Sequence, residues 1–169
     1  MSIMGHPGSG KTFMAEAVAK KLSIPHVHLD RFWLGSGGAD VNKNTSESDK
    51  EKIRTHVRQK ALEAISAESW VSDGSYTRTM PEIAQRADVI IFLDIPLWRR
   101  LLNHGGRIFK PWTRHKELSM WHELSFFAEI IRREYKNSPR LKKFISEHKD
   151  KVVVLKSRKE IDRYLQELH

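Results

Sequence analysis

Gly5-His6-Pro7-Gly8-Ser9-Gly10-Lys11-Thr12 fills every fixed position of the phosphate-loop pattern G-x-x-x-x-G-K-[ST]. Glycines in such a loop allow backbone angles and close approaches that a side chain would forbid, so that successive N–H groups can surround phosphate oxygens. In this pattern Lys11 can reach the β- and γ-phosphates, and the Thr12 hydroxyl can hold Mg²⁺. The stretch therefore predicts a site for ATP and Mg²⁺.

The residues on either side of the loop have the context that the pattern requires. Ser2-Ile3-Met4 is an apolar lead-in that fits the end of a strand, short enough to suggest that a few residues are lost before it. The segment 13–22 carries apolar residues at helical spacing. A strand, a glycine loop and a helix in this order distinguish a phosphate loop from a chance turn, and the helix adds its positive end to the anion site.

Composition places the chain among ordinary globular proteins. Its 169 residues predict one domain with a sizeable core. It has no cysteine, which excludes disulfides and thiolate chemistry and favours a cytoplasmic location. We expect no signal peptide, because the glycine loop interrupts any apolar N-terminal region, and no membrane span, because no apolar run is long enough. The net charge of +9 fits either a nucleic-acid partner or a site for a triphosphate and an anionic acceptor.

Hydrophobic patterns along the rest of the chain alternate between strands and helices. After the lead-in, strands are expected at 25–30, 70–73, 89–94 and 151–155. Helices are expected at 49–67, 96–108, 117–135, 141–147 and 158–168, with loops at 35–48 and 109–115. This order predicts an α/β fold, a three-layer α/β/α P-loop NTPase fold with a five-stranded, mainly parallel sheet.

Three of the expected strands end in aspartate: Asp30, Asp73 and Asp94. A parallel sheet binds its ligand beyond the carboxyl ends of the strands, so we expect all three on the phosphate-loop side. The loop needs a carboxylate near Thr12 to hold Mg²⁺ or its water shell. Asp94 follows a long apolar run and Asp73 precedes a glycine, and the pattern alone leaves both open, with a turn-capping role as the alternative for each.

Two further groups of polar residues have a plain interpretation beside a functional one. His26, His28 and Asp30 would alternate on one face of a strand, which could present three metal ligands. We prefer polar residues at the edge of a cleft, because no residue is apparent that would orient such ligands. A solvated helix face is the plain interpretation of the arginines in the expected helices, which are Arg99, Arg100, Arg132 and Arg133, and we prefer it for Arg99 and Arg133.

The chain resembles the P-loop small-molecule kinases built like adenylate and shikimate kinase, and most closely the bacterial topology-modulation protein family. The resemblance extends over most of the chain. It is carried by the phosphate loop, by Leu29-Asp30 with Trp33, by the segments 70–76 and 87–96, and by the helix that leads to Arg107.

The resemblance implies a kinase that transfers the γ-phosphate of ATP to a small-molecule acceptor, either a nucleotide or a hydroxylated metabolite. It implies a single domain, 1–169, with an acceptor-binding insert at about 31–68 and a lid at about 107–117. By position, the resemblance matches Asp73 rather than Asp94 to the acid near the metal. It matches Asp30 to the residue that holds or deprotonates the acceptor, and Arg107 to a lid-hinge arginine that contacts the transferring phosphate. The residues that match the nucleotide site are Gly5, Gly8, Ser9, Gly10, Lys11, Thr12, Phe13 and Arg158.

The chain also departs from the family pattern. It has Asn103 where family members usually carry an arginine one turn before Arg107, and its expected lid is poorer in arginine, although Arg114 could compensate. Two alternatives therefore stay open: an ATP-binding protein associated with DNA topology modulation, and a nucleotide-binding switch with little turnover. The expected partners are ATP, a small-molecule acceptor and, non-specifically, nucleic acid; we expect no membrane association and a monomer or homodimer.

Overall fold

The computed structural model describes residues 1–36, 41, 45–74, 79–108, 132, 139 and 141–168, with the backbone alone for residues 34 and 104–108. Its strands are β1 (Ser2–Gly5), β2 (His26–His28), β3 (Val71–Asp73), β4 (Ile90–Leu93) and β5 (Val152–Leu155). Its helices are α1 (Lys11–Leu22), α2 (Leu29–Gly35), α3 (Glu47–Ala64), α4 (Met80–Arg86), α5 (Leu97–Ile108) and α7 (Arg158–Glu167), and residues 141–147 are also helical.

The strands form one five-stranded sheet in the order β2-β3-β1-β4-β5, and every pairing in it is parallel. In register, Ile3 of β1 lies beside Asp73 of β3 on one side and beside Ile91 of β4 on the other. The carboxyl ends of all these strands therefore meet at one edge of the sheet, where the phosphate loop leaves β1. The predicted α/β fold with a five-stranded sheet is confirmed.

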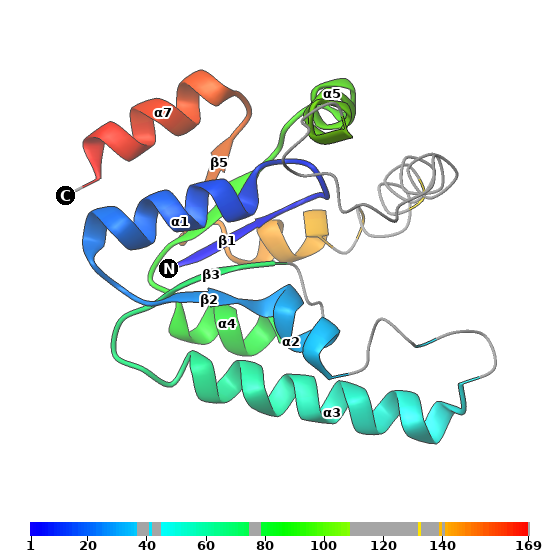
Figure 1. Ribbon diagram of the computed structural model, residues 1–169. Helices are drawn as coiled ribbons and strands as arrows, with labels where there is room; N and C mark the ends of the chain where they lie inside the picture. Colours follow the sequence, from blue (N-terminus) through cyan, green and yellow to red (C-terminus); the bar gives the residue numbers. More distant parts are fainter. Residues whose placement is uncertain are drawn as a thin grey trace.

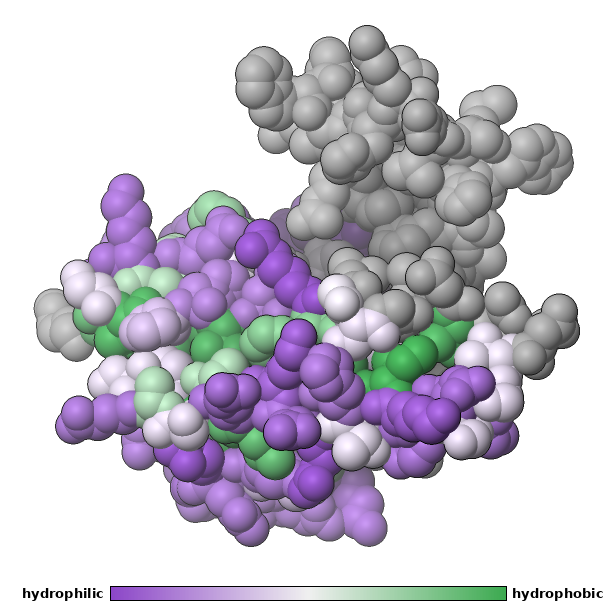
Figure 2. Space-filling model, turned by 60° about the horizontal axis from the view of Figure 1, so that its bottom comes forward, coloured by the Kyte–Doolittle hydropathy of each residue, from purple (hydrophilic) through white to green (hydrophobic). Residues whose placement is uncertain are grey.

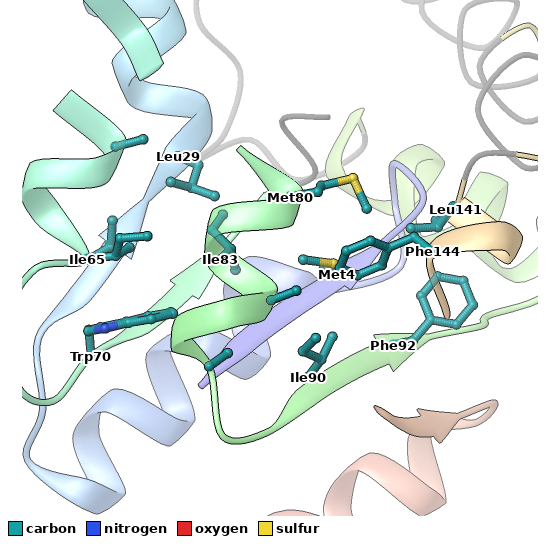
Figure 3. Close-up of a cluster of buried hydrophobic side chains, with 14 residues drawn as sticks. Met4, Leu29, Ile65, Trp70, Met80, Ile83, Ile90, Phe92, Leu141 and Phe144 are labelled. Carbon is teal, nitrogen blue, oxygen red and sulfur yellow. The ribbon is translucent and has the colours of Figure 1, made fainter. Parts of the chain in front are cut away.

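Alternation along the strands produces two cores, one on each face of the sheet. Ile90 and Phe92 of β4 belong to one core and Ile91 and Leu93 to the other, because successive side chains of a strand point to opposite faces. The first core is covered by α3, α4 and the helix at 141–147 (Figure 3). The second is covered by α1 and α7, which lie on the opposite side of the sheet from α3 and α4 (Figure 1). The fold thus has three layers.

The structure corrects two local expectations. Strand β2 ends at His28, and Asp30 lies in the first turn of α2 instead of at the end of a strand; a carboxylate is stabilised in a first helical turn by the helix dipole. Helix α4 was not expected from the sequence, because its seven residues are too few to establish a helical period. A proline in its first turn and the buried side chains Met80, Ile83 and Ala84 explain why it forms.

Other expectations concern residues that the structure does not describe. The predicted loop 109–115, the predicted helix 117–135 apart from residue 132, and most of the expected lid at 107–117 lie outside the described residues. Within the part that is described, no helix is long and apolar enough to cross a membrane. The face formed by α3 is largely hydrophilic (Figure 2), and ion pairs along this helix, such as Lys50 with Glu47 and Lys52 with Asp49, combine both signs of charge.

Candidate active site

The phosphate loop joins β1 to α1 and has the backbone of an anion site. Gly8 and Gly10 have φ angles of 79° and 93°, which favour glycine over any residue with a side chain. Gly10 is the N-cap of α1, no side chain caps this helix, and its first turn holds no acidic residue. The N–H groups of that turn and the positive end of the helix are thus available to an anionic ligand.

Side chains inside the loop fit a phosphate ligand. Lys11 Nζ donates to the carbonyl oxygen of His6 at 3.1 Å, so the ammonium group lies over the loop. The Ser9 N–H donates to the same oxygen at 3.2 Å, whereas Ser9 Oγ is buried and has no hydrogen-bond partner among the described residues. A buried hydroxyl without a partner is costly. A phosphate oxygen in the loop would supply the acceptor that this hydroxyl lacks.

Thr12 and Asp73 come together where β3 lies next to β1. The Thr12 hydroxyl donates to Asp73 Oδ2 at 2.5 Å, and Asp73 is only 1% exposed. Asp94, which follows β4 on the other side of β1, is solvent-exposed. Of the two carboxylates that the sequence left open, Asp73 is therefore the one that contacts the threonine of the phosphate loop.

Two histidines of β2 surround the same carboxylate. His26 Nε2 lies 3.1 Å from Asp73 Oδ1 in hydrogen-bond geometry. His28 Nδ1 lies 2.8 Å from that oxygen, but its orientation is not that of a hydrogen bond. Asp30 is not part of this group, because it lies in α2, and the described residues contain no cluster of three or more His, Asp or Glu side chains that could hold a metal ion. Both histidines thus neighbour the Asp73 carboxylate.

Asp30 lies at the same edge of the sheet, over the residue that follows Asp73. A Cβ built on Gly74 would lie 3.1 Å from Asp30 Oδ1 and 3.1 Å from Leu29 Cβ. Gly74 also has a φ of 115°, a conformation that favours glycine, and the two close contacts leave little space for a side chain. The Asp30 carboxyl is itself solvent-exposed and accessible to a ligand.

A pocket of about 410 Å³ opens beside the loop between α1, α5 and α7. Its polar and aromatic lining consists of Ser9, Gly10, Phe13, Arg99, Asn103 and Arg158, and Ile95 and Ile161 supply apolar surface. The Arg158 guanidinium lies 4.2 Å from the centre of the Phe13 ring, which is 48% exposed. A flat apolar and cationic lining of this kind suits a nucleobase.

The structure brings together most of the predicted site residues: the loop, Phe13, Asp73, Asp30 and Arg158. Arg107 is placed only as a backbone position in the last turn of α5. Two lining residues of the pocket, Ile95 and Ile161, were not expected, and no sequence signal marks them. The plain interpretation of Arg100, a solvated helix face, is wrong, since this residue is buried. Arg99 and Asn103, four residues apart on α5, could have been grouped by helical spacing.

A glycine loop between the first strand and the first helix, with a carboxylate of the neighbouring strand against its threonine, defines the class of P-loop nucleotide-binding proteins with an α/β fold. The model of the AAA family, the "ATPase family associated with various cellular activities", matches residues 1–94. This match includes the loop, Asp30 and Asp73 and extends over more than half of the chain, so the chain belongs to this family.

Solved structures that resemble the chain include two shikimate kinases. The enzyme from Bacteroides thetaiotaomicron is 18% identical, with a TM-score of 0.64, over 99% of this chain and 94% of that one. The enzyme from Acinetobacter baumannii, solved in complex with shikimate, is 15% identical, with a TM-score of 0.57. The match covers 99% of this chain and 89% of that one. These likenesses show a shared fold. A search of curated proteins finds no significant match.

Proposed function

We propose that this protein is an ATP-dependent, Mg²⁺-dependent kinase that transfers the γ-phosphate of ATP to a small-molecule acceptor, either a nucleotide or a hydroxylated metabolite. The observation that carries the proposal is the arrangement at one edge of the sheet. Thr12 and Asp73 are joined by a hydrogen bond, and the exposed Asp30 carboxyl lies over the next residue, Gly74. Nucleotide, metal and acceptor groups thus have candidate side chains at adjacent positions.

The loop residues would hold the nucleotide. The N–H groups of the loop and of the first turn of α1 would bind the β-phosphate, and Lys11 would leave the His6 carbonyl to reach the β- and γ-phosphates. Phe13 and Arg158 would border the nucleobase in the 410 Å³ pocket. The oxygens of Thr12 and Asp73 suit Mg²⁺, which takes few protein ligands beside phosphate oxygens and water. Bound there, Mg²⁺ would neutralise charge on the phosphates.

Asp30 would act on the acceptor. Its carboxylate can accept a hydrogen bond from an acceptor hydroxyl and take that proton as the hydroxyl oxygen bonds to the γ-phosphorus and ADP leaves. We assign the residues around 31–68 to an acceptor-binding insert and those around 107–117 to a lid that excludes water. Arg107, in the last turn of α5, would supply positive charge to the transferring phosphate.

The family match and the solved structures support the general part of this proposal, a nucleotide-binding protein with a kinase-like fold. The AAA family is described as a family of ATPases, and the two solved structures are kinases, one of them in complex with shikimate. The direct test is to measure ADP release from ATP and Mg²⁺ with a panel of nucleosides, nucleotides, sugars and hydroxylated acids. ADP release that depends on one of these compounds is the expected result. A protein that binds ATP but releases no ADP with any of them would instead be a nucleotide-binding switch.

The metal role of Asp73 has a test that separates it from Asp94. In Asp73→Asn, the ATP affinity measured with Mg²⁺ should fall about tenfold, since one charged metal contact is lost. Without Mg²⁺, in EDTA, this variant should bind ATP at least as tightly as the wild type, because a negative charge near the phosphates has been removed. The matched control is Asp94→Asn, for which we expect little change. A larger Mg²⁺-dependent loss in Asp94→Asn would reverse the assignment.

A role in DNA topology modulation is the second candidate, favoured by the resemblance of the segments around Asp30, Asp73 and Arg107 and by the net charge of +9. We expect DNA binding, if present, to be non-specific, with Kd no tighter than about 10⁻⁶ M at physiological salt and a steep dependence on salt concentration. On α3, basic residues are paired with acidic ones, so this helix presents no uniformly basic face. Fluorescence anisotropy with unrelated duplexes at several salt concentrations measures the DNA affinity and its salt dependence. Sequence-selective binding at physiological salt would contradict the expected non-specific binding.

A further inference from the structure

Helix α5 contacts the phosphate loop through the side chains of Arg100 and Asn103, of which Asn103 also lines the pocket beside the loop. Arg100 is 1% exposed, and its Nη1 lies 3.4 Å from the carbonyl oxygen of Pro7. Asn103, about one turn further along α5, donates from Nδ2 to the carbonyl oxygen of Gly8 at 3.1 Å. The backbones are also close, since a Cβ built on Gly8 would lie 2.9 Å from the carbonyl oxygen of Arg100.

Burial of Arg100 requires an explanation, because a guanidinium group removed from water is costly unless hydrogen bonds compensate for the lost solvation. Its Nε donates to the carbonyl oxygen of Ile95 at 2.9 Å, just before α5 begins. The same side chain therefore connects the start of α5 with the Pro7 peptide of the phosphate loop. An apolar side chain could fill this space, but it could not hold either carbonyl.

The direction of the loop carbonyls explains why such contacts affect phosphate binding. In a trans peptide the C=O and N–H bonds point in opposite directions, so a loop that turns its N–H groups inward turns its carbonyls outward. Those carbonyls need partners. Three in succession are held by side chains: His6, Pro7 and Gly8 accept from Lys11, Arg100 and Asn103. The contact from Arg100 thus holds the peptide plane that carries the N–H group of Gly8. The contact from Asn103 holds the next plane, whose Ser9 N–H donates to the His6 carbonyl and so closes the turn of the loop.

We propose that Arg100 and Asn103 are positioning residues that hold the phosphate loop in its phosphate-binding conformation, so that affinity for phosphate depends on the docking of α5 against the loop. The proposal rests on the proposed function, because it concerns the same nucleotide site. It differs from a purely structural role in one measurable respect. Loss of packing alone would lower stability, whereas loss of loop positioning lowers the affinity for phosphate-bearing ligands in protein that is still folded.

The experiment compares Arg100→Met and Asn103→Ala with the wild type, using ATP, inorganic tripolyphosphate and adenosine as probes. Methionine keeps much of the volume of Arg100 and suits a buried site, and Asn103 is solvent-exposed, so its variant keeps the core intact. Calorimetry should show ATP and tripolyphosphate binding about tenfold weaker in Arg100→Met and about threefold weaker in Asn103→Ala. Adenosine affinity in Arg100→Met, measured by ligand-observed NMR, should be unchanged, because Arg100 does not line the nucleobase pocket.

Arg86→Met is the matched control, because Arg86, which lies on α4, also donates to a backbone carbonyl, that of Ser66. The ATP affinity of this variant should equal that of the wild type. Wild-type affinity for ATP and tripolyphosphate in folded Asn103→Ala and Arg100→Met would overturn the proposal. An equal loss of adenosine affinity in Arg100→Met would also overturn it, since the effect would then extend to the whole site. A wild-type protein that binds neither ATP nor tripolyphosphate would instead refute the proposed function, which is a distinguishable result.

Discussion

Replacement of Lys11 by alanine should weaken ATP binding by about 100-fold, which is the loss expected when a charge-assisted contact to two phosphate groups is removed. In the structure the ammonium group lies over the phosphate loop, where it donates to the His6 carbonyl. A short rotation of the side chain would transfer it to a phosphate oxygen. Isothermal calorimetry with Mg²⁺-ATP measures the affinity, and the ATP-induced rise in Tm should shrink in parallel.

Lys20→Ala is the matched control, because Lys20 is an exposed lysine near the other end of α1. It should bind ATP as the wild type does. Lys11→Ala should remain folded, because the hydrogen bond from its ammonium group to the His6 carbonyl lies within the loop and not in the core. An unchanged ATP affinity in folded Lys11→Ala would show that this glycine loop does not bind the nucleotide, and the proposed function would fall with it.

Asp30→Asn should abolish most acceptor-dependent ADP production while leaving ATP binding nearly normal. General-base catalysis by a positioned carboxylate contributes typically about 10²–10⁴-fold to a rate, and the amide cannot accept the proton. Asp30 lies over Gly74, next to Asp73, yet it is not among the residues that line the nucleobase pocket. We therefore expect a loss in kcat of at least about 100-fold, with the KM for ATP little changed.

The alternative role of Asp30 is to stabilise the first turn of α2 by its charge. Under that role, Asp30→Asn would lower the free energy of unfolding and keep its turnover per folded molecule. Both quantities should be measured on the same preparation, with an acceptor identified by the ADP-release panel. Asp150→Asn serves as the control, because Asp150 is exposed and precedes β5, at the opposite edge of the sheet. Normal turnover in folded Asp30→Asn would remove Asp30 from the catalytic role.

Local chemistry was sufficient to predict the phosphate loop. The glycines Gly8 and Gly10 act through their backbone angles, and Lys11 and Thr12 act through side chains that reach only nearby atoms. The spacing of these residues along the chain therefore suffices to predict how they are arranged in space. The same holds for the continuous apolar run that ends at Leu93, which is typical of a strand buried on both faces. The structure places its residues in the two cores on opposite faces of the sheet.

The residue pattern alone did not decide between Asp73 and Asp94; the family resemblance favoured Asp73, and the tertiary structure places Asp73 against Thr12. Both follow strands that pair with β1, and sequence order does not say on which side of β1 the Thr12 hydroxyl will point. The order β2-β3-β1-β4-β5 and the start of α1 place that hydroxyl against β3. The position of the Asp30 carboxyl likewise depended on where β2 ends. Because a helix begins at Leu29, this carboxyl lies over Gly74.

Arg100 shows most clearly what a local sequence pattern cannot predict. Along the chain it is one of two adjacent arginines in an amphipathic helix, a pattern typical of a solvated face. It is buried because α5 packs against a loop some 90 residues away in the chain, whose Pro7 carbonyl requires a donor. Sequence by itself determined the phosphate loop and the α/β layers. The partners of Asp73, Asp30 and Arg100 were decided by contacts between distant segments, which no local pattern encodes.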